Sequence, residues 1–114
     1  MNHPIEGQVV LLAGAKASVP LHRMKPLLGQ AANHLRSVDL DQYERVYADG
    51  EREIYLADPD FWEREGQQLA LARREWDAIR RAHEQQLRRI GSREDRRDEF
   101  ETALEIRTAV VVGV

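Results

Sequence analysis

Hydrophobic residues recur at helical spacing over much of this chain, and the longest such pattern lies in its second half. The pattern starts just after Asp58 and Pro59, which suit the N-cap and first turn of a helix. It continues to Ile90, and Gly91 is expected to end it. The spacing therefore predicts one long amphipathic helix over about 59–90.

One face of this predicted helix repeats every seven residues. It carries Trp62, Leu69, Trp76, His83 and Ile90, with Ile79 beside them. A continuous helix of about 32 residues would be about 48 Å long, whereas a compact domain of this size is roughly 35 Å across. The helix should therefore reach a partner chain, or it should break near Gly66 or turn a corner around Leu69–Ala72. We favour the continuous helix.

The first half of the chain predicts shorter elements. The apolar run over residues 7–13 is typical of a short buried strand, and helical spacing follows over about 25–37. Asp39 and Gln42 form a possible capping box for a helix over 39–48. The alternative is a hairpin, with Asp49-Gly50 as the turn between strands at 43–48 and 51–57. We favour the helix.

The remaining elements are a strand at about 53–57, a helix over about 92–107 that buries Phe100, and a third possible strand over 108–112. The whole pattern predicts a helix-dominated α+β fold of about four helices, with a small sheet of two or three short strands. With 114 residues, we expect a single domain over 1–114. Its first part, 1–57, mixes strands and helices, and its second part, 58–114, holds the long helix and the C-terminal helix.

The composition narrows the classes of function. Hydrophobic residues make up 42% of the chain and charged residues 32%, and cysteine is absent, so disulfides and thiolate zinc sites are excluded. No secretory signal or membrane-spanning stretch is visible, which predicts a cytoplasmic protein without membrane contact. The four histidines lack ligand spacing and no catalytic motif is present. We therefore expect no metal, no cofactor and no enzymatic activity; an enzyme would need residues such as His34, Tyr43, Tyr55 and Glu63 to meet in one pocket.

The charged residues are strongly segregated. Residues 38–65 carry ten acids and three bases, whereas residues 73–97 carry nine arginines and five acids. Acid-first pairs of Asp77 with Arg81 and of Glu84 with Arg88 indicate an exposed, salt-bridged helix face. The same face could contact phosphates or an acidic partner. Its arginines are Arg73, Arg74, Arg80, Arg81, Arg88 and Arg89, followed by Arg93, Arg96 and Arg97.

Two hypotheses of function follow. The first is a non-enzymatic protein–protein interaction module that associates through the Trp62–Ile90 face, with a partner protein or with itself as a homo-oligomer. Such a module could be an adaptor, a small regulator or an assembly subunit, for example of a viral particle. The alternative is a nucleic-acid-binding regulator that uses the Arg73–Arg97 stripe. His83, in an otherwise apolar row, could make helix association depend on pH.

Overall fold

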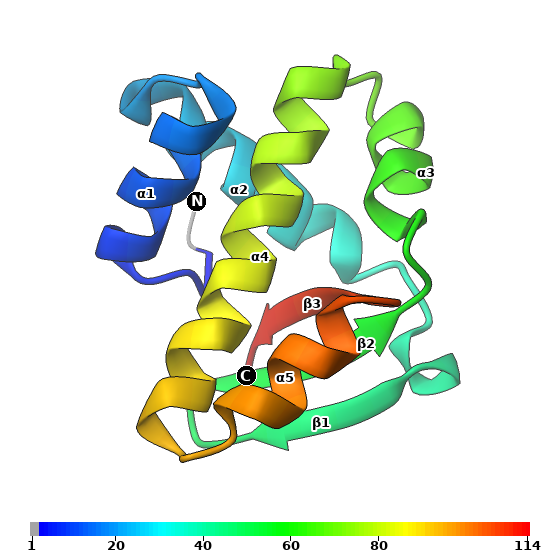
Figure 1. The fold of residues 1–114 in the computed structure, drawn as a ribbon. Coiled ribbons are helices and arrows are strands. Elements are labelled where there is room, and N and C mark those ends of the chain that lie inside the picture. Colours follow the sequence, from blue (N-terminus) through cyan, green and yellow to red (C-terminus); the bar gives the residue numbers. More distant parts are fainter. Residues whose placement is uncertain (1–2) are drawn as a thin grey trace.

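The computed structural model describes residues 3–114, and it confirms a helix-dominated α+β fold. Within these residues five α-helices accompany one antiparallel sheet with the strand order β1-β2-β3 (Figure 1). In chain order the elements are α1 (Gly7–Ala17), α2 (Leu21–Leu35), a 3-10 turn η1 (Leu40–Gln42), β1 (Glu44–Ala48), β2 (Arg52–Ala57), α3 (Phe61–Gln68), α4 (Arg73–Arg93), α5 (Arg97–Leu104) and β3 (Thr108–Gly113).

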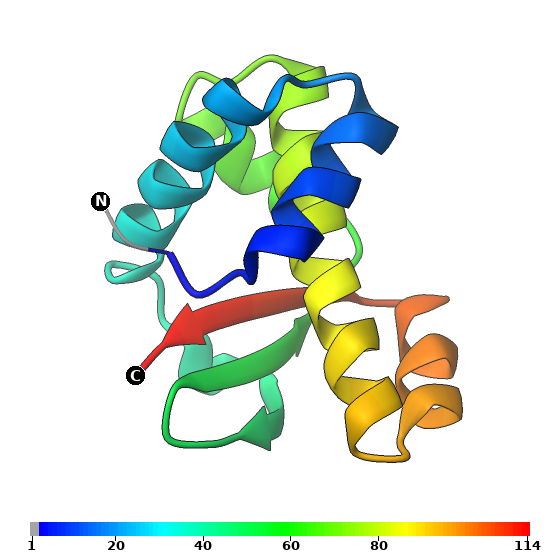
Figure 2. The same ribbon diagram turned by 90° about the vertical axis from the view of Figure 1, so that its left-hand side faces the viewer.

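Helix α4 is the element around which the others are arranged. It contacts the other four helices and also β3. In Figure 2, α1 and α2 lie above the sheet, and α4 runs from that helical end down past the sheet to α5. At about 1.5 Å per residue its 21 residues span about 32 Å. This matches the longest dimension of the molecule, 33 Å, so α4 fits within the domain.

The predicted continuous helix over 59–90 is wrong, because the chain turns a corner between α3 and α4. The corner falls at Leu69–Ala72, the second of the two predicted positions. Ala70 takes a left-handed conformation with φ of 56°, and the Leu71 N–H bonds back to the Gly66 carbonyl at 2.9 Å. This hydrogen bonding is typical of a helix C-terminus. Because of this corner, the two helices fit within the domain, and no partner chain is needed to accommodate them.

Gly66 does not break the helix; it lets the two helices approach closely. A Cβ atom at Gly66 would lie 2.5 Å from the Cβ of Trp76. Gly91 has a similar role and does not end α4, which continues to Arg93. A Cβ there would lie 2.9 Å from the Phe100 ring. The predicted helix over 92–107 is consequently shorter, and α5 covers only Arg97–Leu104.

The predicted strand over 7–13 is wrong, because this segment is the helix α1. Its buried residues Val9, Val10 and Ala13 follow helical spacing and pack against α4. A short apolar run does not by itself distinguish a buried strand from a buried helix. Here the packing surface of α4 decides, and it leaves Leu11 and Leu12 on the outside of α1.

The predicted helix over 39–48 is also wrong, and the alternative hairpin is correct. After the turn η1, β1 pairs with β2 in an antiparallel register from Glu44↔Leu56 to Ala48↔Glu53. The Asp49 carboxylate accepts hydrogen bonds from the backbone N–H groups of Glu51 and Arg52, at 2.7 and 2.8 Å. This side-chain cap stabilises the tight turn at Asp49-Gly50.

The other predicted elements are confirmed with shifted ends. The helix predicted at 25–37 is α2, which starts earlier, at Leu21, and the Pro20 carbonyl accepts its first backbone hydrogen bonds, from the N–H groups of Arg23 and Met24. The strand predicted at 53–57 is β2, and the possible strand at 108–112 is β3. Strand β3 pairs with β2 from Arg52↔Gly113 to Ala57↔Thr108 and forms one edge of the sheet.

Candidate functional site

The Trp62–Ile90 face, predicted to bind a partner, lies mostly in the protein's own core. Trp62, Ile79, His83 and Ile90 are each no more than 3% exposed. They are therefore not available to a partner in this structure. The heptad pattern correctly identifies a buried face, but the surface that covers it belongs to the same chain.

Trp62 and His83 cover the outer edge of β3. The Trp62 indole Nε1 donates a hydrogen bond to the Ala109 carbonyl at 3.0 Å, and the Val111 N–H donates to His83 Nδ1 at 2.9 Å. The two rings also contact each other, with centroids 4.5 Å apart. Backbone groups on a sheet edge would otherwise need water or another strand. These two side chains thus close this edge of the sheet from within the molecule.

Burial determines the charge state of His83. Desolvation lowers the pKa of its imidazole to about 3, so the ring is neutral near pH 7. Only a neutral ring can accept the hydrogen bond from Val111 at Nδ1. His83 therefore acts as a fixed acceptor inside the domain, rather than as a half-buried residue at a helix–helix seam.

The other two members of the predicted face remain partly exposed. Leu69 lies at the end of α3, and Trp76 lies on the first turns of α4. The Trp76 side chain packs against Gly66 and borders a shallow groove together with Arg73 and Ile106. These two residues alone do not form a continuous apolar face.

The predicted arginine stripe lies on the outer side of α4, and most of its members form ion pairs. Arg80 and Arg81 both bind Asp77, at 2.6 and 2.8 Å, so the predicted Asp77–Arg81 pair is confirmed. The predicted Glu84–Arg88 pair is wrong. Glu84 is buried and binds Arg80 at 3.1 Å and the Thr108 hydroxyl at 2.6 Å.

Two arginines at the start of α4 differ from the paired arginines of the stripe. Arg73 and Arg74 are exposed, and neither lies within 4.0 Å of a carboxylate in residues 3–114. Five stripe residues remain. Arg96 pairs with Glu99 at 2.7 Å, and the other four line a groove farther along the helix: Arg88, Arg89, Arg93 and Arg97.

This groove, which we call the basic groove, has a volume of about 720 Å³ and forms where α1, α4 and α5 meet. Five cations line it, and they come from all three helices: Lys16, Arg88, Arg89, Arg93 and Arg97. Arg88 pairs with Glu101, while Arg89 and Arg93 pair with Glu6. Two carboxylates thus face five cations, which leaves an excess of three positive charges. Within residues 3–114, Lys16 and Arg97 have no carboxylate within 4.0 Å.

Glu6 fixes α1 against α4 and so completes the groove. Its carboxylate binds Arg93 at 2.6 Å and the side chain of the buried Gln86 at 2.7 Å. The hydrogen bond from Arg93 is the main cause that lowers the Glu6 pKa to about 2, and the bond from Gln86 adds to it. Gln86 also accepts the backbone N–H of Glu6 at 2.8 Å. Because α1 is held here, Lys16 near its other end reaches the groove.

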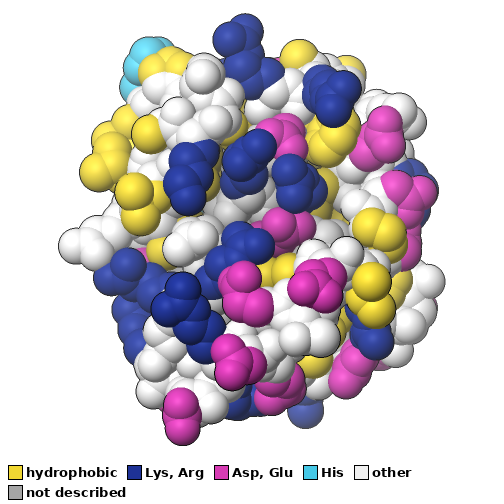
Figure 3. Space-filling view, in the orientation of Figure 1, with side chains coloured by type: hydrophobic (Ala, Val, Ile, Leu, Met, Phe, Trp, Pro, Cys, Tyr) yellow, Lys and Arg dark blue, Asp and Glu magenta, His cyan; other side chains and the backbone are white. Residues whose placement is uncertain are grey.

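Of two exposed leucines on α1, Leu12 adjoins the groove. Leu11 and Leu12 of α1 are 56% and 48% exposed, and Leu12 borders a small hollow with Lys16, Arg81 and Arg88. In Figure 3, Lys and Arg side chains gather over α1 and α4, hydrophobic side chains lie at the left-hand margin over α1, and Asp and Glu side chains lie over α5. Cationic and apolar groups therefore share one continuous surface.

Lys16 is not among the predicted site residues, because the sequence predicts a strand over 7–13 that ends before it. Once the segment is taken as a helix, Leu12 and Lys16 fall four residues apart on one face. Helical spacing of Val9, Val10 and Ala13 was the available signal. No local pattern indicates that Arg97, from a different helix, lies near Lys16.

The four residues that an enzyme would need in one pocket do not all line the same pocket in this structure. Tyr55 lines a cleft beside the sheet, whereas Glu63 lines a different groove. His34 forms a pair with the buried Glu65 at 2.7 Å. Across residues 3–114, no three His, Asp or Glu side chains converge in the way that metal ligands do. In the same part of the chain, no helix has the length and hydropathy needed to cross a membrane.

Comparison with known proteins places the chain in a family. Residues 3–114 match the family model described as "Domain of unknown function (DUF8048)", and the chain belongs to this family. Neither the curated proteins nor the solved structures contain a match. The function proposed below therefore rests on the geometry of the molecule.

Proposed function

We propose that this member of the family is a non-enzymatic protein-interaction module that binds an acidic, partly apolar segment of a partner protein. The basic groove would bind the acidic side chains, and Leu11 and Leu12 would contact the apolar ones. The observation that carries the proposal is the excess of three positive charges in the groove, on a chain whose formal net charge is −3. A local excess of this kind attracts and orients an oppositely charged partner.

The leucines favour a protein partner over a phosphate backbone. Burying a leucine side chain fully contributes about 1.5–3 kcal/mol, so covering two half-exposed leucines contributes roughly 2 kcal/mol in all. An exposed ion pair contributes only about 0.2–1 kcal/mol. The apolar contacts would then supply much of the affinity, and the cations would select an acidic sequence. Large interfaces commonly have this arrangement of an apolar centre and a polar rim.

The direct test uses two synthetic helical peptides built from Glu, Leu and Ala, with the leucines on one face. The second peptide has Gln in place of every Glu. We expect fluorescence anisotropy to show binding of the acidic peptide and binding at least about tenfold weaker for the Gln peptide, a difference of about 1.4 kcal/mol. The Lys16→Glu/Arg97→Glu variant should weaken binding of the acidic peptide at least as much, and so should Leu11→Ser/Leu12→Ser.

The matched control is the Lys25→Glu/Arg74→Glu variant, which makes the same change of charge at two exposed residues outside the groove. It should retain most of the binding. If both charge-reversal variants lost the same affinity for the acidic peptide, the attraction would depend on overall charge and not on the groove, which would contradict the proposal. Light scattering provides a second check. If it detects a dimer that Lys16→Glu/Arg97→Glu disrupts, the groove binds a second copy of the chain, and the proposal of a different partner protein is overturned.

The second candidate function is nucleic-acid binding, and the exposed arginines along α4 favour it. Arg73 and Arg74 at its start, with Arg81 and Arg88 farther along, extend over much of its roughly 30 Å. Such a line could follow a phosphate backbone. Against it, Arg81 and Arg88 are already paired with carboxylates, and no aromatic side chain lines the basic groove for base stacking.

A salt titration with random duplex and single-stranded oligonucleotides separates the two functions. Nucleic-acid binding predicts measurable affinity at about 50 mM salt that falls steeply as salt rises. It also predicts that changing Arg74, Arg81 and Arg88 together to Glu abolishes binding. The protein-interaction proposal predicts no oligonucleotide binding under conditions in which the acidic peptide binds.

A further inference from the structure

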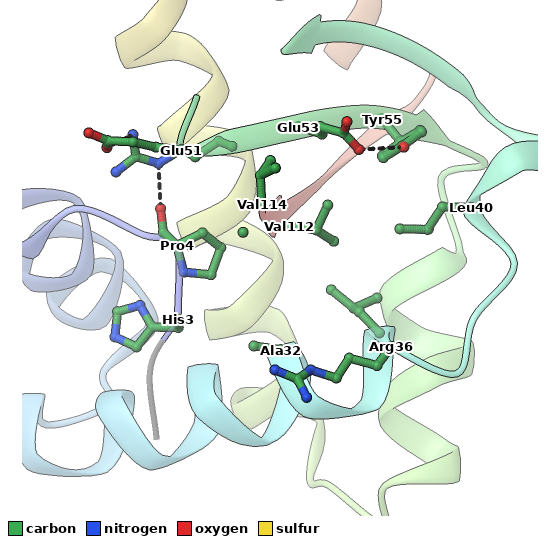
Figure 4. Close-up of a pocket in the computed structure, with 13 residues that line it drawn as sticks. His3, Pro4, Ala32, Arg36, Leu40, Glu51, Glu53, Tyr55, Val112 and Val114 are labelled. Carbon is green, nitrogen blue, oxygen red and sulfur yellow. Dashed lines mark hydrogen bonds and ion pairs between the residues drawn. The ribbon is translucent and has the colours of Figure 1, made fainter. Parts of the chain in front are cut away.

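A second concave site lies away from the basic groove, between α2 and the sheet. Figure 4 shows this cleft, with Ala32 and Arg36 of α2 on one side and Glu53 and Tyr55 of β2 on the other. Its volume is about 640 Å³, within the range of about 300–1,000 Å³ that is common for small-molecule sites. Its apolar lining comes from four separate segments of the chain: Pro4, Ala32, Leu35, Leu40 and Val112.

The acidic side chains of the cleft already have partners. The Tyr55 hydroxyl donates to Glu53 at 2.9 Å, and Arg45 binds the same carboxylate at 3.1 Å. Arg52 lies 3.3 Å from Glu51 and donates a second hydrogen bond to the Pro4 carbonyl at 2.6 Å. These contacts fix the wall formed by β2 and neutralise its charges.

Arg36, on the opposite wall, is a cation without an acidic partner in the described part of the chain. It is exposed, and no carboxylate in residues 3–114 lies within 4.0 Å of it. His3 provides an uncharged donor at the same cleft. Burial lowers the pKa of His3, and the nearby charge of Lys25 lowers it further, so the ring is neutral near pH 7. Its Nδ1 accepts the Ile5 N–H at 3.2 Å, which places the ring proton on Nε2.

We propose that this cleft binds a small amphipathic monocarboxylate. The carboxylate would pair with Arg36, whose planar guanidinium suits a forked carboxylate contact. The hydrocarbon part would cover Leu35, Leu40 and Val112. A dianion is disfavoured because Arg36 is the one arginine among the lining residues without a carboxylate partner in residues 3–114, and because the carbonyl end of α2 partly offsets the charge of Arg36.

This site is independent of the proposed function, because the cleft and the basic groove share no lining residue. A ligand in the cleft could be bound whether or not the groove binds an acidic peptide. Failure of one test therefore leaves the other proposal unaffected.

The test is a ¹H–¹⁵N NMR titration of the protein with sodium octanoate, kept below its micelle-forming concentration. We expect shifts concentrated at amides around the cleft, such as those of Leu40, Tyr55 and Val112. Octyltrimethylammonium, with the same chain and the opposite charge, should bind at least about tenfold more weakly. Arg36→Gln should weaken octanoate binding about tenfold. The matched change Arg74→Gln, at an exposed arginine that lines neither the cleft nor the basic groove, should leave it unchanged.

A cavity-filling variant provides the second measurement. Ala32 lies on the helical wall of the cleft and is partly exposed, so leucine can replace it without filling the core. Because leucine is also a good helix former, Ala32→Leu should leave the domain folded while the cleft loses volume. Octanoate shifts should then disappear, and they should persist in Ala15→Leu on the exposed side of α1. Unchanged affinity in Arg36→Gln, equal binding of the cationic detergent, or shifts centred on Leu11 and Leu12 would each overturn the proposal.

Discussion

Replacing His83 should remove most of the protein's loss of stability between pH 7 and about pH 5. In the fold the imidazole is buried at the edge of β3 and accepts the Val111 N–H, and its pKa is lowered from 6.5 to about 3. In the unfolded chain the same ring takes up a proton near pH 6.5. Below that pH the unfolded state binds one proton more than the folded state, so stability falls as the pH falls.

The magnitude follows from one proton per molecule. Each pH unit well below 6.5 costs about 1.4 kcal/mol, so lowering the pH from 7 to about 5 costs about 2 kcal/mol. His3 shifts in the same direction and adds a smaller amount because it is less buried. Glu6, whose pKa is lowered from 4.5 to about 2, contributes stability that is lost only below about pH 5. The pH range above 5 therefore isolates the histidines.

The assay is urea unfolding, followed by far-UV circular dichroism at several pH values between 7 and about 5. His83→Asn keeps an acceptor at the δ position while it removes the titrating ring. We expect it to be less stable than the wild type at pH 7, but with most of the pH dependence gone. His22→Asn, on the exposed side of α2, should retain the wild-type dependence. An unchanged pH dependence in His83→Asn would refute the assignment of a buried neutral ring.

Three further substitutions test the close contacts of the fold, each by its free energy of unfolding in urea. Gly66→Ala places a Cβ 2.5 Å from that of Trp76 and should destabilise by about 1–3 kcal/mol, whereas Gly7→Ala, with no atom within 4 Å, should stabilise by up to about 1 kcal/mol. Ala70→Gly should stabilise by about 0.5–1 kcal/mol, because φ at this position is 56°; a loss of stability would contradict the left-handed corner. Trp62→Phe should destabilise by about 1–3 kcal/mol, because the buried Ala109 carbonyl loses its donor; a neutral result would show that another group satisfies that carbonyl.

The elements that the sequence predicts well are those whose pattern is periodic and bounded by clear signals. α2, β2 and β3 are of this kind. The errors fall where the deciding interaction is distant in sequence. The run at 7–13 becomes a helix because α4 offers it a surface, and the Ala70 corner lacks the glycine or proline that usually marks such a turn.

The heptad row illustrates a more general limit. Its spacing correctly shows that Trp62, His83 and Ile90 share a buried face, but spacing does not specify which surface buries them. Trp62 and His83 are covered by β3, which begins at Thr108, after the whole row has been completed along the chain. The over-long helix points to a partner chain only while it is taken as continuous. The corner at Leu69–Ala72, which is the alternative that the sequence also allows, removes this need.

The sequence shows which residues could form the candidate interaction surface, but not which of them the fold brings together. The arginines of α4 are recognisable in the sequence, yet most of them are neutralised by carboxylates that lie on other elements or one turn away. What distinguishes the basic groove is the addition of Lys16 from α1 and Arg97 from α5, which are 81 positions apart in the chain. Their proximity depends on Glu6 and Gln86 holding α1 against α4. Changing Gln86 to Leu should therefore loosen α1 and weaken binding of the acidic peptide without altering any charge in the groove; if binding is unchanged while α1 amides gain hydrogen exchange, Lys16 does not contribute to the site.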